Sequence, residues 1–192
     1  FAHGAGSPMD SNFMSKIAIG MASKNLMIIR FEFNYMKKRR EGFKSFPDSI
    51  NKLCLFYESF INQIKDQFPN KDIWLAGKSM GGRVAAIISR KINVRGVVVF
   101  GFPFHPIKAI DKLRLNSLQE DGPPILVIQG TRDKFGNYDE VNKYNINKNN
   151  TIYWIIDGDH SFNTLKSSKK DTSDSIKEAY LRAYDFILHQ HI

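Results

Sequence analysis

Cysteine is almost absent from the sequence: Cys54 is the one cysteine among 192 residues, so an internal disulfide is excluded. This favours a reducing compartment, and we expect a cytoplasmic protein. No apolar run approaches the roughly 18 residues that a transmembrane helix needs. The sequence also lacks Cys, His or carboxylate clusters with metal-ligand spacing, and it has no glycine loop of Walker type. We therefore expect no metal and no other cofactor.

Acidic residues are fewer than basic ones, with 19 Asp and Glu against 28 Lys and Arg, which gives a formal charge of +9. Such a balance attracts anionic partners. The patterned aromatics and recognition helix of a nucleic-acid-binding module are missing, however, so nucleic-acid binding is the weakest functional hypothesis. The basic run at 37–40 is interpreted as a solvated loop, and the alternative is a contact with a phosphate or an acidic substrate.

Apolar runs alternate with amphipathic segments along a length that suits one domain, residues 1–192. Apolar runs bounded by turn residues predict strands at 25–33, 73–77, 94–100, 124–130 and 151–156. Helical spacing of apolar residues predicts helices at 12–23, 47–68, 80–91, 138–144 and 175–189. The alternation predicts a doubly wound α/β domain, with a mostly parallel sheet and helices on both faces. Because Phe1 stands at the end of an apparent strand, we expect earlier strands before it.

A Gly-x-Ser-x-Gly pattern, formed by Gly77, Ser79 and Gly81, falls between a predicted strand and a predicted helix. A sharp strand-to-helix turn strains the serine backbone, and flanking glycines avoid collisions there. The serine hydroxyl is then exposed beside the helix N-terminus. A serine becomes a good nucleophile only when an imidazole takes its proton and a carboxylate orients that imidazole. We interpret Ser79 as a candidate nucleophile.

Other candidate groups also follow predicted strands, and the carboxyl ends of parallel strands meet at one edge of a sheet. His160 is the candidate general base and acid, and Asp133 is the candidate orienting carboxylate. Competing residues of the same types are Asp139, Asp157 and Asp159 for the carboxylate, and His105 for the base. The His-Gly-Ala-Gly sequence at 3–6 also ends an apparent strand, and we expect His3 to organise this loop.

Four motifs resemble those of the α/β-hydrolase superfamily: residues 3–6, Gly-Lys-Ser-Met-Gly-Gly-Arg at 77–83, Gly-Thr-Arg-Asp at 130–133 and Asp-Gly-Asp-His at 157–160. The chain order Ser, Asp, His is also that of the superfamily. The resemblance extends over nearly the whole chain. It implies that the acid follows the strand before the histidine loop, which favours Asp133.

The sequence is most similar to small lidless domains related to dienelactone hydrolase. Residues 30–36 and 77–83 carry a narrower resemblance to predicted hydrolases typified by a testis-expressed protein and a subunit of the NSL chromatin complex. No insertion after the 94–100 strand could build a cap, so a lipase is disfavoured. The resemblance also implies that the early strands of the domain precede Phe1.

Two backbone donors are needed for a tetrahedral oxyanion, and we expect them to be the N–H groups of Met80, at the helix N-terminus, and Ala5. Four residues after strand ends either line a substrate pocket or pack at the edge of the core: Phe102, Phe104, His105 and Phe135. His189 and His191 are expected in solvent.

The leading hypothesis is a serine hydrolase that cleaves a small-molecule ester or related acyl bond through an acyl-enzyme. The alternative is a hydrolase-like interaction module with little or no activity, because a fold does not determine a function.

Overall fold

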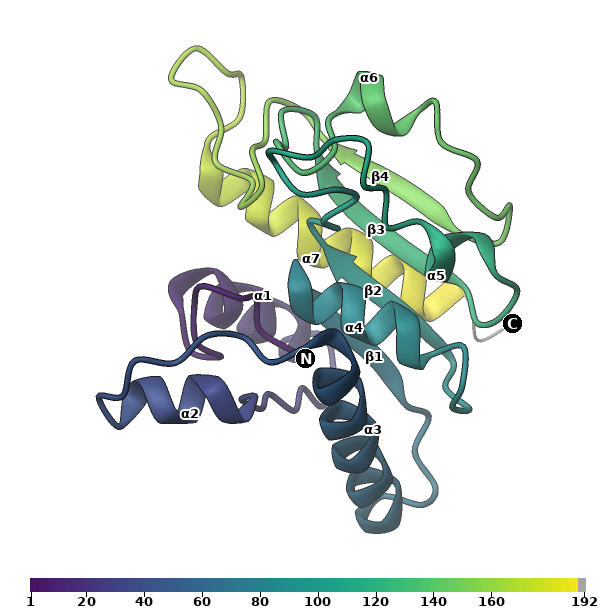
Figure 1. The fold of residues 1–192 in the computed structure, drawn as a ribbon. Helices are drawn as coiled ribbons and strands as arrows, with labels where there is room; N and C mark the ends of the chain where they lie inside the picture. The colour runs from purple at the N-terminus through teal and green to yellow at the C-terminus, as the bar shows by residue number, and fades with distance from the viewer. Residues whose placement is uncertain (190–192) are drawn as a thin grey trace.

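The computed structural model describes residues 1–189, and the expectation for His191 lies outside them. Four parallel strands form a sheet in the order β1-β2-β3-β4. Their bounds are Trp74–Lys78 for β1, Gly96–Phe100 for β2, Ile125–Gly130 for β3 and Thr151–Ile155 for β4. Helices lie on both faces of the sheet, so the predicted α/β fold is confirmed (Figure 1).

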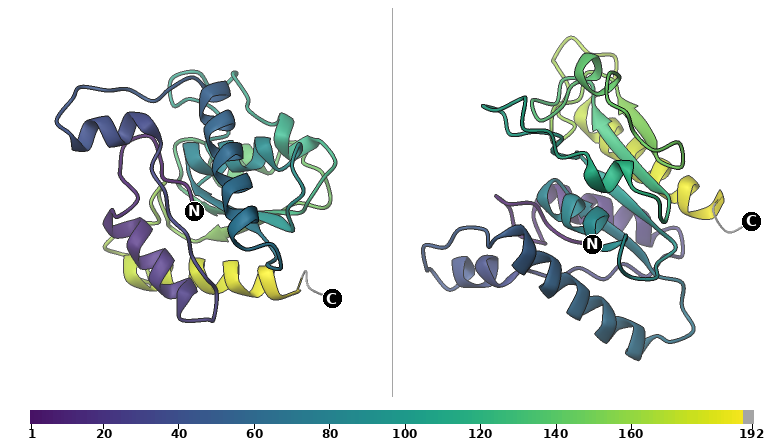
Figure 2. Two further views of the ribbon diagram at one scale, coloured as in Figure 1. Left: turned by 90° about the horizontal axis from the view of Figure 1, so that it is seen from below. Right: turned by 45° about the vertical axis from the view of Figure 1, so that its right-hand side comes forward.

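The helices are α1 (Asn12–Ala22), α2 (Asn34–Arg40), α3 (Ile50–Gln67), α4 (Met80–Ile88), α5 (Asn116–Gln119), α6 (Tyr138–Val141) and α7 (Thr172–His189). The pair α1 and α7 covers one face, and the pair α3 and α4 covers the other (Figure 2). Within residues 1–189, no helix combines the length and apolarity needed to cross a bilayer.

Strand β2, one of the two inner strands of the sheet, is buried on both sides. Val97 and Val99 belong to the core under α3 and α4, whereas Val98 and Phe100 belong to the core under α1 and α7. Each of these four side chains is fully buried. This explains why the sequence of β2 is apolar at consecutive positions and does not alternate with polar residues.

The first residues of the chain lie along the free edge of β1. Ala2 forms parallel bridges to both Phe31 and Gly77. Its N–H donates to the Ala76 carbonyl at 2.9 Å, and its own carbonyl accepts from the Lys78 N–H at 2.9 Å. The main chain after Ala2 therefore emerges at the carboxyl end of β1, where Ser79 follows.

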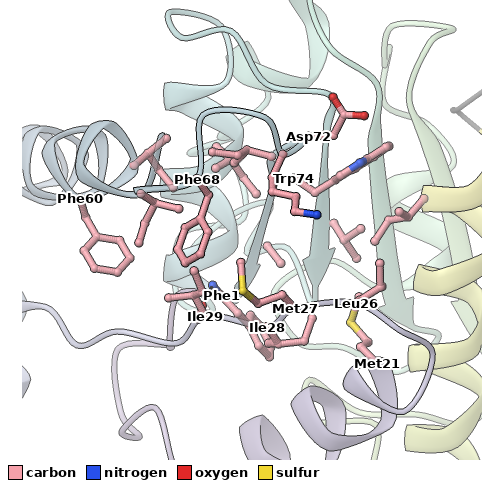
Figure 3. A pocket seen from close by; sticks show the side chains of 18 of the residues that line it. Phe1, Met21, Leu26, Met27, Ile28, Ile29, Phe60, Phe68, Asp72 and Trp74 are labelled. Atoms are coloured by element: carbon pink, nitrogen blue, oxygen red, sulfur yellow. Dashed lines mark hydrogen bonds between the residues drawn. The ribbon is translucent and has the colours of Figure 1, made fainter. Parts of the chain in front are cut away.

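The strand predicted at 25–33 is wrong, because only Phe31 in this segment forms a bridge. A strand needs a hydrogen-bonded neighbour along its length, and Ala2 provides one at a single position. Residues 25–29 border an apolar groove of about 480 Å³ (Figure 3). Its opposite walls come from α3, including Phe60, and from β1, including Trp74. None of the candidate site residues lines this groove.

The loop predicted at 37–40 is also wrong, because these residues form the last turn of α2. Basic side chains favour the negative C-terminal end of a helix dipole. Buried Tyr35 and Met36 anchor the helix. Arg40 lies between two carboxylates, 2.7 Å from Glu32 and 2.6 Å from Asp10. At least one residue of the basic run, Arg40, therefore forms structural ion pairs.

Candidate active site

Ser79 lies between β1 and α4 with φ 52° and ψ −116°. A positive φ is unfavourable for a residue with a side chain and persists only where neighbouring structure holds it. Two hydrogen bonds do so here: the Ser79 N–H donates to the Phe100 carbonyl at 3.0 Å, and the Ser79 carbonyl accepts from the Arg83 N–H at 2.9 Å. Strand β2 and helix α4 thus impose the expected strained turn.

The glycines around Ser79 allow α4 to cross closely over the sheet. A Cβ at Gly77 would collide with the backbone of Gly81 and Gly82. A Cβ at Gly82 would in turn collide with the Val99 side chain on β2. These glycines are therefore required by the close packing of α4 against β1 and β2.

The His160 imidazole bridges two other candidate side chains. Its Nε2 lies 2.8 Å from Ser79 Oγ, and its Nδ1 lies 2.7 Å from Asp133 Oδ2. Because the carboxylate accepts, Nδ1 carries the proton and Nε2 is left to accept from the serine hydroxyl. Asp133 is completely buried, whereas 22% of the His160 side chain is exposed. This arrangement can move a proton from the serine to the imidazole.

Asp133 is fixed on both carboxylate oxygens. Oδ2 also accepts from Gln129 Nε2 at 2.9 Å, and Oδ1 accepts from the Phe135 N–H at 2.8 Å. The competing Asp159 accepts instead from the N–H groups of Ser161 and Asn163, at 2.7 and 2.9 Å, and so shapes the histidine loop. The structure brings Asp133, and not Asp159, to the imidazole.

Gln129 was missed in the sequence analysis, although it is the polar residue of the otherwise apolar β3. Its side chain is completely buried. Besides holding Asp133, its Oε1 accepts from the Phe102 N–H at 2.7 Å. A buried amide inside a strand is satisfied only when it cross-links neighbouring segments, and here it joins the loops after β2 and β3.

Lys78, the residue before the candidate nucleophile, is buried and was also missed. Its Nζ donates to the His160 carbonyl at 2.6 Å and lies 5.4 Å from the centre of the Phe13 ring. Burial lowers the pKa of Lys78 to about 8. The signal in the sequence was a charged side chain at the end of a buried strand.

Electrostatics favour a neutral His160. Burial is the largest cause and lowers its pKa below the usual value of 6.5, while the hydrogen bond to Asp133 opposes this shift. The charge of Lys78 lowers the pKa further. A neutral imidazole is the form that can accept a proton.

The 3–6 loop lies against the serine turn. A Cβ at Gly4 would lie 3.6 Å from Ser79 Cβ. Buried His3 holds this loop, because its Nδ1–H donates to the Gly4 carbonyl at 2.7 Å and its Nε2 accepts from the Phe33 N–H at 3.1 Å. Burial lowers the pKa of His3. This geometry agrees with the expected organising role of His3.

The N–H groups of Ala5 and Met80 both remain available as donors. Neither donates to an acceptor in the part of the chain that the structure describes. Met80 is the first residue of α4, where N–H groups have no partner within the helix. Arg39 donates to the Ala5 carbonyl at 3.2 Å and so ties α2 to this loop.

Two of the four residues expected near a substrate are instead part of the core. Phe102 and Phe104 are fully buried, with ring centres 4.9 Å apart. Edge-of-core packing, the alternative interpretation, describes them. Phe135 is half-buried, and the centre of its ring is 4.5 Å from that of His160. Of these three phenylalanines, Phe135 is the one whose ring lies beside the His160 imidazole.

His105 does not join the Ser79 site. It is 1% exposed, and its Nε2 lies 3.3 Å from Glu140 Oε2. Among residues 1–189, no group of three or more His, Cys, Asp or Glu side chains could hold a metal ion. His189, at the end of α7, is exposed as expected.

Comparison with known proteins adds the family. Residues 1–188 match the alpha/beta hydrolase domain. The chain belongs to this family. A homologue of alpha-beta serine hydrolases from Coxiella burnetii superposes with a TM-score of 0.73 at 16% identity, over 97% of this chain and 83% of that one.

Two other solved structures share the fold. An esterase from Pyrococcus furiosus has a TM-score of 0.72 at 18% identity, over 98% of this chain and 80% of that one. A lidless serine hydrolase from Xanthomonas campestris has a TM-score of 0.69 at 16% identity, over 95% and 80% respectively. At these identities, the structural likeness establishes the fold and not the activity.

Proposed function

We propose that the protein is a serine hydrolase that cleaves small carboxylic esters, with Ser79 as nucleophile, His160 as general base and acid, and Asp133 as orienting carboxylate. The observation that carries the proposal is the pair of hydrogen bonds made by one imidazole, 2.8 Å to Ser79 Oγ and 2.7 Å to Asp133 Oδ2. Distances of this size allow direct proton transfer without rearrangement.

The reaction proceeds in two halves. His160 Nε2 takes the Ser79 proton as Oγ attacks the ester carbonyl, and the resulting imidazolium is stabilised by Asp133. The tetrahedral intermediate collapses when the imidazolium gives this proton to the leaving alcohol. Water then attacks the acyl-serine, with His160 as base, and releases the acid and free Ser79.

The oxyanion of each tetrahedral intermediate is bound by the N–H groups of Met80 and Ala5. Support comes from the lack of acceptors for these donors among residues 1–189 and from the contact of the 3–6 loop with Ser79. The helix dipole of α4 adds to the donor strength of Met80. One such donor contributes about 3 kcal/mol to lowering the barrier.

Small substrates fit the short connection between β2 and β3, which carries only the four-residue helix α5 and offers no cap domain. The ring of Phe135, beside His160, supplies an apolar surface next to the reacting groups. An esterase and a lidless serine hydrolase among the structural neighbours support the proposed reaction class.

The proposal is tested with a panel of p-nitrophenyl esters of increasing acyl length. We expect turnover of the short esters by the wild-type protein and none above background by Ser79→Ala. Ser89→Ala is a matched control, because Ser89 is a buried serine at the other end of α4. Equal turnover by wild type and Ser79→Ala in folded proteins would refute the assignment.

The interaction module remains the second candidate, motivated by the narrower sequence resemblance at 30–36 and 77–83 to a chromatin-complex subunit. It predicts that no ester of any acyl length is turned over by a folded protein whose serine is intact. Turnover that depends on Ser79 excludes a purely structural role.

A further inference from the structure

A second, strongly basic cavity lies along α4, on the side of the helix that faces residues 113–120. Its volume is about 520 Å³. Four basic side chains line it, with one acidic side chain: Arg83, Arg90, Lys91 and Arg114, and Glu120. Ser79, Asp133 and His160 do not line this cavity, so it is distinct from the serine site.

Arg83 and Arg114 have no counter-charge. Neither side chain makes a hydrogen bond, ion pair or ring contact with any residue from 1 to 189, and both are half-buried. Elsewhere, Arg40 and Arg95 lie 2.7 and 3.0 Å from a carboxylate. Burial lowers the pKa of Arg83, and repulsion from Arg114 lowers it further. Two partly desolvated like charges held together destabilise the fold, so packing alone does not account for them.

Arg90 is the fixed member of the group. Its Nε donates to the Ser117 carbonyl and its Nη1 to the Pro123 carbonyl, both at 2.9 Å. Its Nη2 is buried and has no acceptor in the described part of the chain. A buried donor of this kind is costly unless a ligand or water satisfies it.

We propose that this cavity is a binding site for a phosphate group, held chiefly between Arg83 and Arg114. Guanidinium groups match the spacing of two phosphate oxygens and form charge-assisted pairs with them. Three guanidinium groups and the Lys91 ammonium suit a dianion with three terminal oxygens better than a single carboxylate. The Arg83 N–H donates to the Ser79 carbonyl, so the proposed site begins one helical turn from the serine.

The first test is a titration of the protein with inorganic phosphate at low ionic strength, followed by ¹H–¹⁵N NMR of the arginine side chains. We expect saturable shifts of the Arg83 and Arg114 Nε–H signals and weaker shifts with succinate. Arg83→Gln and Arg114→Gln should each weaken phosphate binding by about tenfold, the value of one lost charge-assisted pair. Arg95→Gln is the charge-matched control and should bind like the wild type.

The second test separates binding from packing. In phosphate-free buffer, Arg114→Gln should keep or raise the melting temperature, because it removes repulsion from Arg83. Ser79→Ala should bind phosphate as the wild type does, which makes this result independent of the esterase proposal. The site is refuted by equal phosphate binding in all variants, by tighter binding of succinate, or by a melting temperature several degrees lower in Arg114→Gln.

Discussion

The Lys78 ammonium donates a 2.6 Å hydrogen bond to the backbone carbonyl of His160. Lys78 is the last residue of β1, directly before the candidate nucleophile, and His160 follows β4. This bond therefore connects the end of the first strand of the sheet to the loop after the last strand. The lysine acts in two ways: it positions the histidine loop, and its charge lowers the pKa of the imidazole.

Lys78→Met should shift the acid limb of the activity profile. In the wild type, we expect the proposed activity to be lost as pH falls through the His160 pKa, which lies below 6.5. Removing the nearby positive charge raises that pKa, so the activity should be lost at a higher pH than in the wild type. In addition, kcat should fall because the histidine loop loses its hydrogen bond to Lys78. The measurement is kcat/KM for a short ester between about pH 4.5 and 9. Lys166→Met, at an exposed position, is the control. An unmoved limb in Lys78→Met would contradict the electrostatic part of this account.

His3→Phe should lower stability and reduce its pH dependence. The variant leaves the Phe33 N–H without its acceptor, at a cost of about 1–3 kcal/mol. The Gly4 carbonyl loses one donor and keeps the other, the Tyr35 hydroxyl at 3.1 Å. The folded-state pKa of His3 is lowered by burial. The unfolded chain therefore takes up protons first as pH falls below about 6.5, and wild-type stability declines over that range.

Denaturant unfolding at pH 7.5 and 5.5 checks this prediction. The difference in unfolding free energy between the two pH values should be smaller in His3→Phe than in the wild type. The exposed His189 provides the matched variant His189→Phe, for which we expect wild-type behaviour. An equal pH dependence of stability in wild type and His3→Phe would contradict the claim that His3 is buried in its neutral form.

Asp133→Asn should reduce kcat by about 10³- to 10⁴-fold, because an amide cannot hold the imidazole in the Nδ1–H tautomer. The change also places an NH₂ group against the donors of Gln129 or Phe135. Steady-state kinetics on the panel of p-nitrophenyl esters measures this fall in kcat. Asp139→Asn, at an exposed position, should keep full activity. Similar losses in both variants would remove Asp133 from its proposed role.

The local features of the serine turn could be predicted because they depend on nearby residues. Gly77, Ser79 and Gly81 fall between an apolar strand and an amphipathic helix, and a Cβ at Gly77 would collide with the nearby backbone of Gly81 and Gly82. The strand prediction for residues 25–33 was wrong for the opposite reason. Its apolar run is typical of a strand, but pairing depends on a neighbour, and only Ala2 provides one.

Long-range contacts could not be predicted. Lys78 and His160 are 82 positions apart, and Gln129 joins Phe102 across 27 positions. Lys78 and Gln129 are polar residues in apolar strands. This pattern indicates that each has a buried partner, but it does not identify the partner. Similarly, Phe102 and Phe104 follow a strand end as site residues do, and only the packing shows them to be in the core.

Gly77→Ala should destabilise the fold strongly. The added Cβ would collide with the backbone of Gly81 and Gly82, which cannot move without shifting α4. We expect a loss of at least about 2 kcal/mol in the free energy of unfolding. Gly6→Ala is the matched control, because nothing lies within 4 Å of a Cβ there, and it should change stability by less than about 0.5 kcal/mol. Chemical denaturation that finds the two variants equally stable would contradict the close crossing at the serine turn.

The most direct test of the central claim is labelling with a fluorophosphonate probe, followed by peptide mapping. Such a probe forms a covalent bond only with a serine that is activated by a neighbouring base. We predict that the wild-type protein is labelled at Ser79, that Ser79→Ala is not labelled, and that labelling slows as pH falls through the lowered His160 pKa. A folded wild-type protein that stays unlabelled, or is labelled at another serine, would contradict the account.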